Sequence, residues 1–346
     1  MTAESEENAP EILSRVDGHT GVLTLNRPKA INSLTHSMVT AMAAALTGWA
    51  ADDDVAAVIV TGAGERGLCA GGDVVALYHS ARAGGAEARR FFSDEYRLNA
   101  QIGRYAKPYV ALMDGIVMGG GVGISGHGNV RVVTDTCKIA MPEVGIGFIP
   151  DVGGTYLLSR APGRLGLHAA LTGAPFGAGD AIAMGFADHY VPHAALEAFT
   201  AAVVAGGVEQ AVTAYAEEPP ASPLAAQRDW IDDCYAADTV ADIVAALRRK
   251  DKTDAADLIA TRSPIACAVT CASVRAAADL PTLQDVLVQE YRVSCASLRS
   301  HDFVEGIRAQ LVDKDRNPTW SPSSPAEVTD ADVQAYFQPA DPDLTF

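Results

Sequence analysis

Short apolar runs alternate with amphipathic segments through the N-terminal half of the chain. Continuous apolar runs of strand length are typical of strands buried on both faces, and apolar residues recurring at spacings of three and four predict helices. The expected strands are 11–16, 21–25, 55–60, 109–113 and 129–134, with a further short strand and turn in 185–192. The expected helices are 35–51, 74–82, 86–103, 121–126, 155–160 and 164–172. This alternation predicts crossover connections and a largely parallel sheet in an α/β fold.

The pattern changes near Pro192. From there to about residue 310 the sequence is Ala-rich and helical in spacing, with breaks at 217–223 and 263–264. We therefore expect residues 1–192 to form an α/β core that holds the functional site. Residues 193–346 are expected to form a helical C-terminal region.

Composition and charge narrow the function classes. The chain has 346 residues and a net charge of −17, so nucleic acid and anionic membranes are not expected partners, because both would be repelled. A local basic patch can still bind an anionic ligand. The six cysteines are scattered without CxxC spacing and no His completes a metal-binding group, so we expect buried free thiols and no metal.

Location is predicted from two further features. The opening MTAESEENAP is acidic and polar, unlike the basic and apolar regions of a signal peptide. The most apolar stretch, 109–126, is interrupted by Asp114 and crowded with Gly, so no segment is expected to span a bilayer. We therefore expect a cytoplasmic protein.

The stretch 109–154 carries the candidate chemistry. Glu143 and Asp151 lie eight residues apart, on segments rich in Gly and Pro that are expected to be non-helical. Gly119, Gly120 and Gly121 precede them, and without a Cβ their backbone N–H groups can closely approach a ligand. Carboxylates beside backbone donors, with no His partner or metal cluster, indicate proton transfer next to a stabilised oxyanion.

Two glycine loops supply the expected donors. The loop 70–73 follows one buried strand and the loop 118–121 follows the next, and each ends where a helix is expected to begin. Helix N-termini present unpaired N–H groups and favour negative charge. If the strands are neighbours, one N–H from each loop can reach the same carbonyl oxygen and form an oxyanion hole. Alternatively, each loop is merely a tight turn.

A dinucleotide site is the rival interpretation of the same stretch. Residues 121–126 fit G-x-G-x-x-G, and Glu143 lies near the distance expected of a ribose-binding acid. However, seven residues separate this motif from the preceding strand, and the glycines around His127 would cut its helix short. The context therefore disfavours a dinucleotide.

Four ordered motifs carry a family resemblance. They are LNRPKAINSL at 25–34, CAGGD at 69–73, DG at 114–115 followed by GGG at 119–121, and MPE at 141–143. With them the sequence resembles the crotonase (enoyl-CoA hydratase/isomerase) superfamily. The resemblance implies a ββα spiral core, a coenzyme A thioester as substrate and no separate cofactor. Members of the family often form homo-oligomers.

The resemblance also implies residue roles. The N–H groups of Gly72 and Gly120 are expected to form the oxyanion hole. Substrate and coenzyme contacts are expected from the 27–30 loop, the 71–73 turn and the glycines after the second strand, namely Arg27, Lys29, Ala30, Gly71, Asp73, Gly119 and Gly123.

One departure narrows the activity. Hydratases of the family use two glutamates; the second matches Glu143, but the first falls at Gly123. Residues 149–154, IPDVGG, together with 302–309 and 313–320, instead resemble the 3-hydroxyisobutyryl-CoA hydrolases of the superfamily, which implies thioester hydrolysis. Glu143 is then a general base or a nucleophile.

Asp151 has two interpretations. It accepts a hydrogen bond from a substrate hydroxyl or holds the water, or it caps the helix expected to follow it. An enoyl-CoA hydratase or isomerase on the same fold, and a non-catalytic acyl-CoA-binding protein, are the alternative functions.

Overall fold

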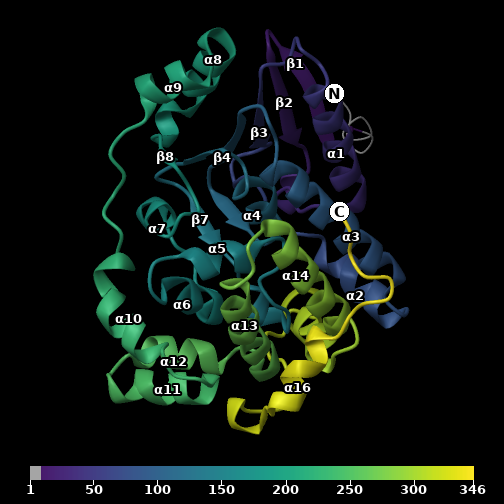
Figure 1. Cartoon of the computed structure of the whole chain (residues 1–346), viewed down its shortest axis with the longest axis vertical. Coiled ribbons are helices and arrows are strands. Elements are labelled where there is room, and N and C mark those ends of the chain that lie inside the picture. The colour runs from purple at the N-terminus through teal and green to yellow at the C-terminus, as the bar shows by residue number, and fades with distance from the viewer. Residues whose placement is uncertain (1–8) are drawn as a thin grey trace.

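A computed structural model describes residues 9–346. Most of the acidic opening used above to predict location lies outside the described residues. The main sheet has six strands in the order β1-β2-β3-β4-β6-β8 (Figure 1). Their bounds are β1 Ile12–Asp17, β2 Thr20–Leu25, β3 Ala57–Gly62, β4 Tyr109–Met113, β6 Val130–Val133 and β8 His189–Tyr190. Only β1 and β2 pair antiparallel, so the predicted largely parallel sheet is confirmed.

A second sheet was missed by the sequence pattern. It consists of β5 (Ile116–Met118) and β7 (Lys138–Ala140), which pair in parallel. Each strand has three residues, too few for an alternation to be recognised. Strand β5 follows β4 after a turn at Gly115 and leads directly to the glycine run, so it sets where that run lies.

The predicted helical segments of the core closely match observed helices, and a further helix at Ala178–Ala183 was not predicted. Their bounds are α1 His36–Ala50, α2 Val74–Arg82, α3 Ala86–Gly103, α4 Gly120–Ser125, α5 Gly154–Arg160, α6 Leu165–Thr172 and α7 Ala178–Ala183. Helix α2 begins at Val74 because the Asp73 side chain caps it, accepting a hydrogen bond from Ala76 N at 3.3 Å.

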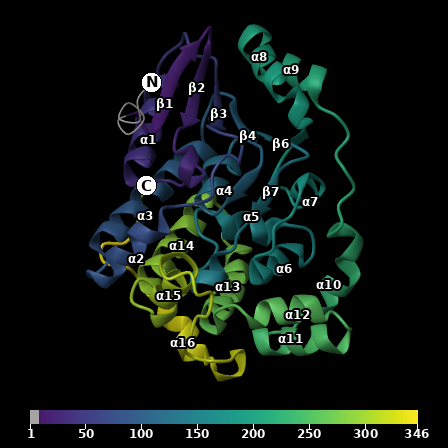
Figure 2. The same ribbon diagram turned by 180° about the vertical axis from the view of Figure 1, so that it is seen from behind.

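The C-terminal region is mainly helical, with irregular stretches at 216–224 and 313–324. Its helices are α8 Leu196–Gly206, α9 Val208–Tyr215, α10 Arg228–Cys234, α11 Val240–Arg249, α12 Thr253–Ala260, α13 Pro264–Ala277, α14 Leu283–Ser297, α15 His301–Ile307 and α16 Asp330–Gln334. Figures 1 and 2 show α8 and α9 beside the main sheet and α10–α12 at the opposite end of the molecule. Among residues 9–346, no helix has both the length and the apolar character needed to cross a membrane.

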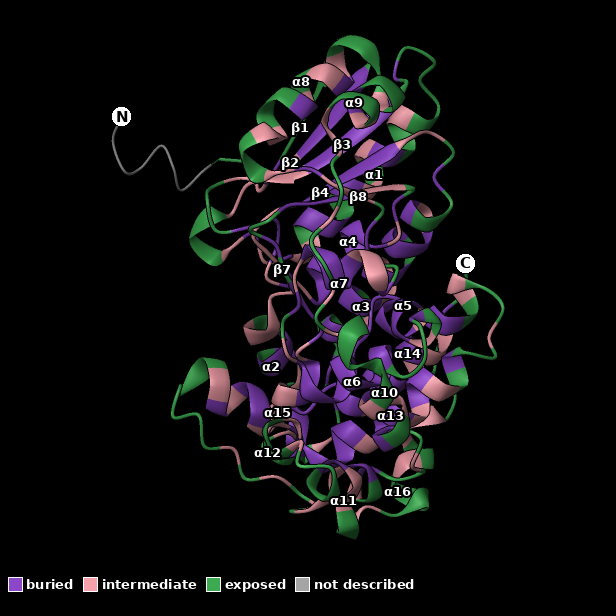
Figure 3. Ribbon diagram, turned by 90° about the vertical axis from the view of Figure 1, so that its left-hand side faces the viewer, coloured by how far each residue is buried: buried purple, intermediate pink, exposed green. Residues whose placement is uncertain are grey.

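These helices share the interior of the first part. Phe199 and Val203 of α8 pack on Val110 of β4, and α14 packs on α3 and α5. The largest hydrophobic cluster includes residues from Ile12 to Leu344, and Figure 3 shows buried residues continuing from the sheet through the lower helices. The C-terminal helices therefore form part of the frame around the site; the boundary at Pro192 stays a prediction.

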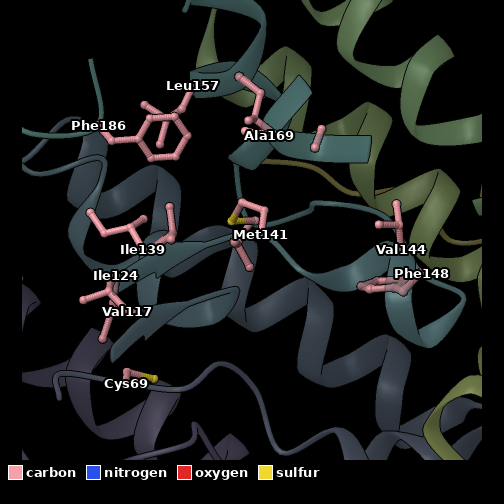
Figure 4. Close-up of a cluster of buried hydrophobic side chains, with 14 of the residues drawn as sticks. Cys69, Val117, Ile124, Ile139, Met141, Val144, Phe148, Leu157, Ala169 and Phe186 are labelled. Carbon is pink, nitrogen blue, oxygen red and sulfur yellow. The ribbon is translucent and has the colours of Figure 1, made fainter. Parts of the chain in front are cut away.

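The segment after β7 is anchored by apolar side chains. Met141, Val144 and Phe148 are buried, and Figure 4 shows Met141 on the side of Ile139 and Val144 next to Phe148 further along the segment. Burial of side chains of this size contributes about 1.5–3 kcal/mol each. The anchoring fixes the backbone on both sides of Glu143.

Candidate active site

A cavity of about 500 Å³ lies between the two glycine loops, helix α3 and the segment after β7. Eight of the predicted site residues line it: Ala30, Gly71, Gly72, Asp73, Gly119, Gly120, Glu143 and Asp151. Phe91, Phe92 and Phe148 supply an apolar wall. The C-terminal region adds Arg262 and Leu311. An apolar pocket with a few converging polar groups is typical of a small-molecule site.

The two glycine loops meet at the cavity. Strands β3 and β4 are parallel neighbours, so the loops that follow them reach the same edge of the sheet. A Cβ added to Gly120 would lie 3.2 Å from Gly72 N. Within residues 9–346, neither amide donates a hydrogen bond. Two unpaired N–H groups thus lie side by side at the cavity, as an oxyanion hole requires.

Local pairing explains why the Gly72 amide is unpaired. Leu34 donates from its N to Gly71 O at 2.8 Å, and Asp73 N donates to Leu34 O at 2.9 Å. The residues on either side of Gly72 therefore both hydrogen-bond to Leu34. The N–H of Gly72 itself is left unpaired beside Gly120.

Gly119 places the first carboxylate. Its φ of +48° and ψ of −118° favour glycine, and a Cβ there would lie 2.8 Å from Glu143 Oε1. The Glu143 carboxylate therefore lies close to Gly119, and it lines the same cavity as Gly72 and Gly120. Glu143 begins a 3-10 helix, Glu143–Ile146, so the expectation of a non-helical segment is wrong here: one short turn forms despite the glycines.

The surroundings of Glu143 favour a reactive carboxylate. It is 7% exposed, and its Oε2 has no hydrogen-bond partner among the described residues. Burial, and secondly the charge of Asp151, raises the pKa of Glu143 well above its ordinary value of 4.5. A buried carboxylate with a free oxygen and a raised pKa is suited to act as general base or nucleophile.

Asp151 is held by a hydroxyl chain. Tyr96 of α3 donates to Asp151 Oδ2 at 2.6 Å, and the Tyr96 hydroxyl lies 2.7 Å from Ser294 Oγ of α14. Burial raises the pKa of Asp151 to about 7, although the bond from Tyr96 opposes the shift. The capping alternative is wrong, because α5 begins after Gly153 with no side-chain cap.

Glu95 was missed from the sequence. It lies on α3, fully buried, with Oε1 unpaired among the described residues and 2.8 Å from where a Gly120 Cβ would be. Burial, and then the charge of Asp151, raises its pKa well above 4.5. The available signal was an acid on the apolar face of a helix, in line with Phe91 and Phe92. Such a position is costly unless the group has a partner or a function.

Three predicted residues, all within the described chain, lie outside the cavity lining. The Arg27 guanidinium pairs with Glu11, with 3.1 Å between Nε and Oε1, and donates from Nη1 to Ser33 O at 2.6 Å. These contacts stabilise the loop to which Arg27 belongs. The carbonyl of Lys29 accepts from Arg66 Nη2 at 2.6 Å. Gly123 is packed closed, since a Cβ there would lie 2.7 Å from Val152 Cβ.

The cavity has one cation that the sequence did not single out. Among the described residues, Arg262 is the only Arg or Lys in the lining. Its Nε and Nη2 donate to Thr172 O at 3.0 and 2.7 Å. The guanidinium is therefore held in place at the cavity by the carboxyl end of α6. A fixed cation there offsets part of the acidic lining for an anionic ligand.

Similar proteins share both the fold and the length of the chain. Residues 20–337 match the family model for enoyl-CoA hydratase/isomerase. The zebrafish (Danio rerio) protein named 3-hydroxyisobutyryl-CoA hydrolase, mitochondrial, is 40% identical over 97% of this chain and 92% of its own length. The human (Homo sapiens) protein of the same name is 39% identical over 95% and 89%.

Solved structures agree in fold but have other names. One described as a carnitinyl-CoA dehydratase from Mycobacterium thermoresistibile has a TM-score of 0.96 at 72% identity, covering 98% of this chain and 99% of its own. One described as an enoyl-CoA hydratase from Rhodobacter sphaeroides has a TM-score of 0.92 at 40% identity, covering 97% and 100%. The family match, the relatives and these structures all span nearly the whole chain, and the protein belongs to the enoyl-CoA hydratase/isomerase (crotonase) family.

Proposed function

We propose that this protein hydrolyses a short hydroxyacyl-CoA thioester, 3-hydroxyisobutyryl-CoA, to 3-hydroxyisobutyrate and coenzyme A. The observation that supports this most is that Glu143 lines the same cavity as Gly72 and Gly120, while Gly123 is closely packed by Val152. A side chain at 123 has no room, so the first glutamate expected of a hydratase has no counterpart there. The relatives named hydrolases support the same conclusion.

The arrangement suits attack on a thioester carbonyl. With the carbonyl oxygen at the two amides, charge that develops on it is stabilised. Glu143 either removes a proton from water as water attacks the carbonyl carbon, or attacks that carbon itself to give a mixed anhydride that water then cleaves. In both routes the C–S bond breaks and the coenzyme leaves as a thiolate that takes up a proton.

Asp151 is proposed to recognise the 3-hydroxyl of the acyl group. Tyr96 donates to one of its oxygens, and Asp151 lines the cavity. A site whose buried polar group expects a hydroxyl discriminates against acyl groups that lack one, because that group is then left unpaired. Coenzyme A is part of the substrate in this proposal, and no separate cofactor takes part. With this substrate the reaction belongs to valine breakdown.

Hydration of an enoyl-CoA is the second candidate. The observation in its favour is Glu95, which places a second buried glutamate beside Gly120 although position 123 lacks one. Two of the similar solved structures are described as a dehydratase and a hydratase, and these descriptions also support hydration as a candidate.

Two assays separate the candidates. The protein is mixed with 3-hydroxyisobutyryl-CoA and a thiol reagent, and separately with crotonyl-CoA while the absorbance of the conjugated thioester is followed. We expect thiol release in the first assay and unchanged absorbance in the second. Loss of absorbance without thiol release would establish hydration instead, and no change in either would favour a non-catalytic acyl-CoA-binding protein.

Asp151→Asn is expected to affect hydroxyacyl substrates selectively. A hydrogen bond to a charged group is worth about 1.5–3 kcal/mol, so kcat/KM for 3-hydroxyisobutyryl-CoA should fall about 10- to 100-fold. Isobutyryl-CoA, which has no hydroxyl, is the matched control substrate and should lose about threefold or less. Equal losses on the two substrates would show that Asp151 does not recognise the hydroxyl.

Location and assembly are also proposals. We retain the cytoplasm as the expected location, although the vertebrate relatives are named mitochondrial. We propose a homo-oligomer because members of the family often form them. Light scattering of the purified protein measures the molar mass in solution and tests this directly.

A further inference from the structure

The residue after Asp151 has an unfavourable backbone conformation. Val152 has a φ of +54°, in the left-handed region that a β-branched residue rarely adopts. Its side chain is buried and packs against Gly123. A Cβ added to Gly123 would lie only 2.7 Å from Val152 Cβ. Such a conformation persists only where its surroundings over-determine it, and these sites cluster at functional positions.

The peptide group that joins Val152 to Gly153 is gripped at both ends. Its carbonyl oxygen, Val152 O, lies 2.7 Å from His127 Nε2. Since a carbonyl only accepts, His127 donates from Nε2. The N–H of the same peptide, on Gly153, donates to Glu290 Oε2 at 2.6 Å. A flip of this peptide would turn its oxygen toward a carboxylate and its N–H toward a donor, so its orientation is fixed.

Glu290 has no other visible task. It belongs to α14, in the C-terminal region, and its side chain is fully buried. Its second oxygen accepts from Thr155 N at 2.9 Å and from Thr155 Oγ1 at 2.6 Å. The three donors belong to Gly153, the residue before α5, and to Thr155, the second residue of that helix. No described side chain of α5 caps that helix, so Glu290 takes over this function from 135 residues away in the chain.

We propose that Glu290 is a positioning residue, which holds the strained turn 151–153 and thereby aims the Asp151 carboxylate into the cavity. The inference rests on the proposed function, because it assigns Asp151 a role in turnover. His127 holds the same turn from the other side, through its hydrogen bond to Val152 O. We call Glu290 and His127, which bond the two ends of the Val152–Gly153 peptide, the clamp. Through Glu290, helix α14 holds the turn that carries Asp151. In this proposal α14 contributes to catalysis by placing the backbone of that turn, and Glu290 does not touch the reacting atoms.

Charge around the clamp gives an additional readout. The charge of Glu290 acts on Glu143, on the segment after β7, and on Tyr96 of α3, and Asp151 in the turn acts on Glu290. Asp151 and Glu95 act on Glu143 as well. The Glu290 charge adds to the rise in the pKa of Glu143. Burial raises the pKa of Glu290 itself to about 8, against the hydrogen bonds that it accepts from Thr155 and Gly153. In the pH range in which Glu290 is ionised, removing its charge lowers the pKa of Glu143, so the acid side of the kcat profile should move to lower pH. A residue that only filled space would leave this profile in place.

Glu290→Gln tests the proposal. The amide keeps the size of the side chain but turns an NH₂ toward one of the backbone donors. We expect kcat for 3-hydroxyisobutyryl-CoA to fall about 10²-fold, because small displacements of catalytic groups have effects of that order, with KM within about twofold. Gln289→Ala is the matched control: this neighbouring side chain bonds Ser273 O at 3.0 Å, away from the turn, and kcat should not change.

Hydrogen exchange separates the clamp from the chemistry. In Glu290→Gln the Gly153 and Thr155 amides should exchange faster, while those of α13 keep their protection. A kcat within twofold of wild type, or loss of protection spread evenly over α13 and α14, would overturn the proposal. If wild-type protein releases no thiol, the proposed function fails, and exchange at Gly153 still decides whether Glu290 holds the turn.

A milder variant is available if Glu290→Gln does not fold. Thr155→Val is nearly isosteric and removes one of the three donors to Glu290. We expect kcat to fall about three- to tenfold with KM unchanged, and unchanged kcat would count against the clamp.

Discussion

Replacement of Glu143 by glutamine is expected to reduce kcat about 10³-fold and to leave KM within about threefold. General base catalysis typically contributes 10²- to 10⁴-fold, and an amide can neither take a proton from water nor attack a thioester. The side chain keeps its size, so the cavity and its amides should keep their shape. Steady-state thiol release measures kcat, and calorimetric titration with coenzyme A measures affinity. Turnover close to that of wild type would remove Glu143 from the mechanism.

The same variant has a predictable effect on stability. The folded-state pKa of Glu143 is raised above 4.5, so the native protein binds this proton more tightly than the unfolded chain. Stability from this group is therefore lost as the pH rises from about 4.5 through the folded pKa. Above that range Glu143→Gln should melt at a higher temperature than wild type. The exposed Glu218, which lies outside the helices and strands, provides the control, since Glu218→Gln should alter neither kcat nor the melting temperature.

Local sequence determined much of the fold. Helices 74–82 and 86–103 were predicted with the bounds that the structure has, because Asp73 is a strong cap and glycines separate the two segments. The apolar strand 109–113 was equally clear. Strands β5 and β7 were missed because three residues show no periodicity. They are strands only by virtue of pairing with each other, which is a tertiary effect.

The residues of the candidate site also fall into two groups, those that local sequence reveals and those that only tertiary contacts reveal. Glu143, Asp151, Gly72 and Gly120 lie in glycine-rich stretches of the sequence, where a polar residue has few structural reasons to be present, and all four line the cavity. Glu95 and Glu290 lie on helices whose spacing is otherwise ordinary. What marks them is burial opposite segments far away in the chain, and one sequence does not reveal which helical faces meet.

The basic residues illustrate a different limit. Arg27 was expected at the coenzyme because its loop is part of the family motif, but its guanidinium pairs with Glu11 and Asp73. A side chain this long can reach several partners, so the identity of the residue does not fix its role. Arg262 reaches the cavity from the C-terminal region, held by Thr172 O, a contact between elements 90 residues apart.

Gly120→Ala is expected to reduce kcat about 10²- to 10³-fold. Alanine keeps the backbone N–H, but its Cβ would keep the thioester oxygen away from that donor, and the loss of access to one oxyanion donor has an effect of this size. The added Cβ would lie 3.2 Å from Gly72 N, in the space that the thioester oxygen needs. The fold should tolerate the change: Gly120 is the first residue of α4, is not among the positive-φ glycines, and its nearest obstacle is the end of the Glu95 side chain at 2.8 Å.

Gly48→Ala is the matched control for this substitution. Gly48 lies in α1, and a Cβ there would meet nothing within 4 Å. Alanine in a helix is favoured over glycine by about 0.5–1 kcal/mol, so this variant should melt at a slightly higher temperature and keep full activity. A Gly120→Ala protein that melts like wild type but hydrolyses the thioester at the wild-type rate would mean that the oxyanion forms elsewhere, because no donor pair that includes the Gly120 amide could still accommodate it.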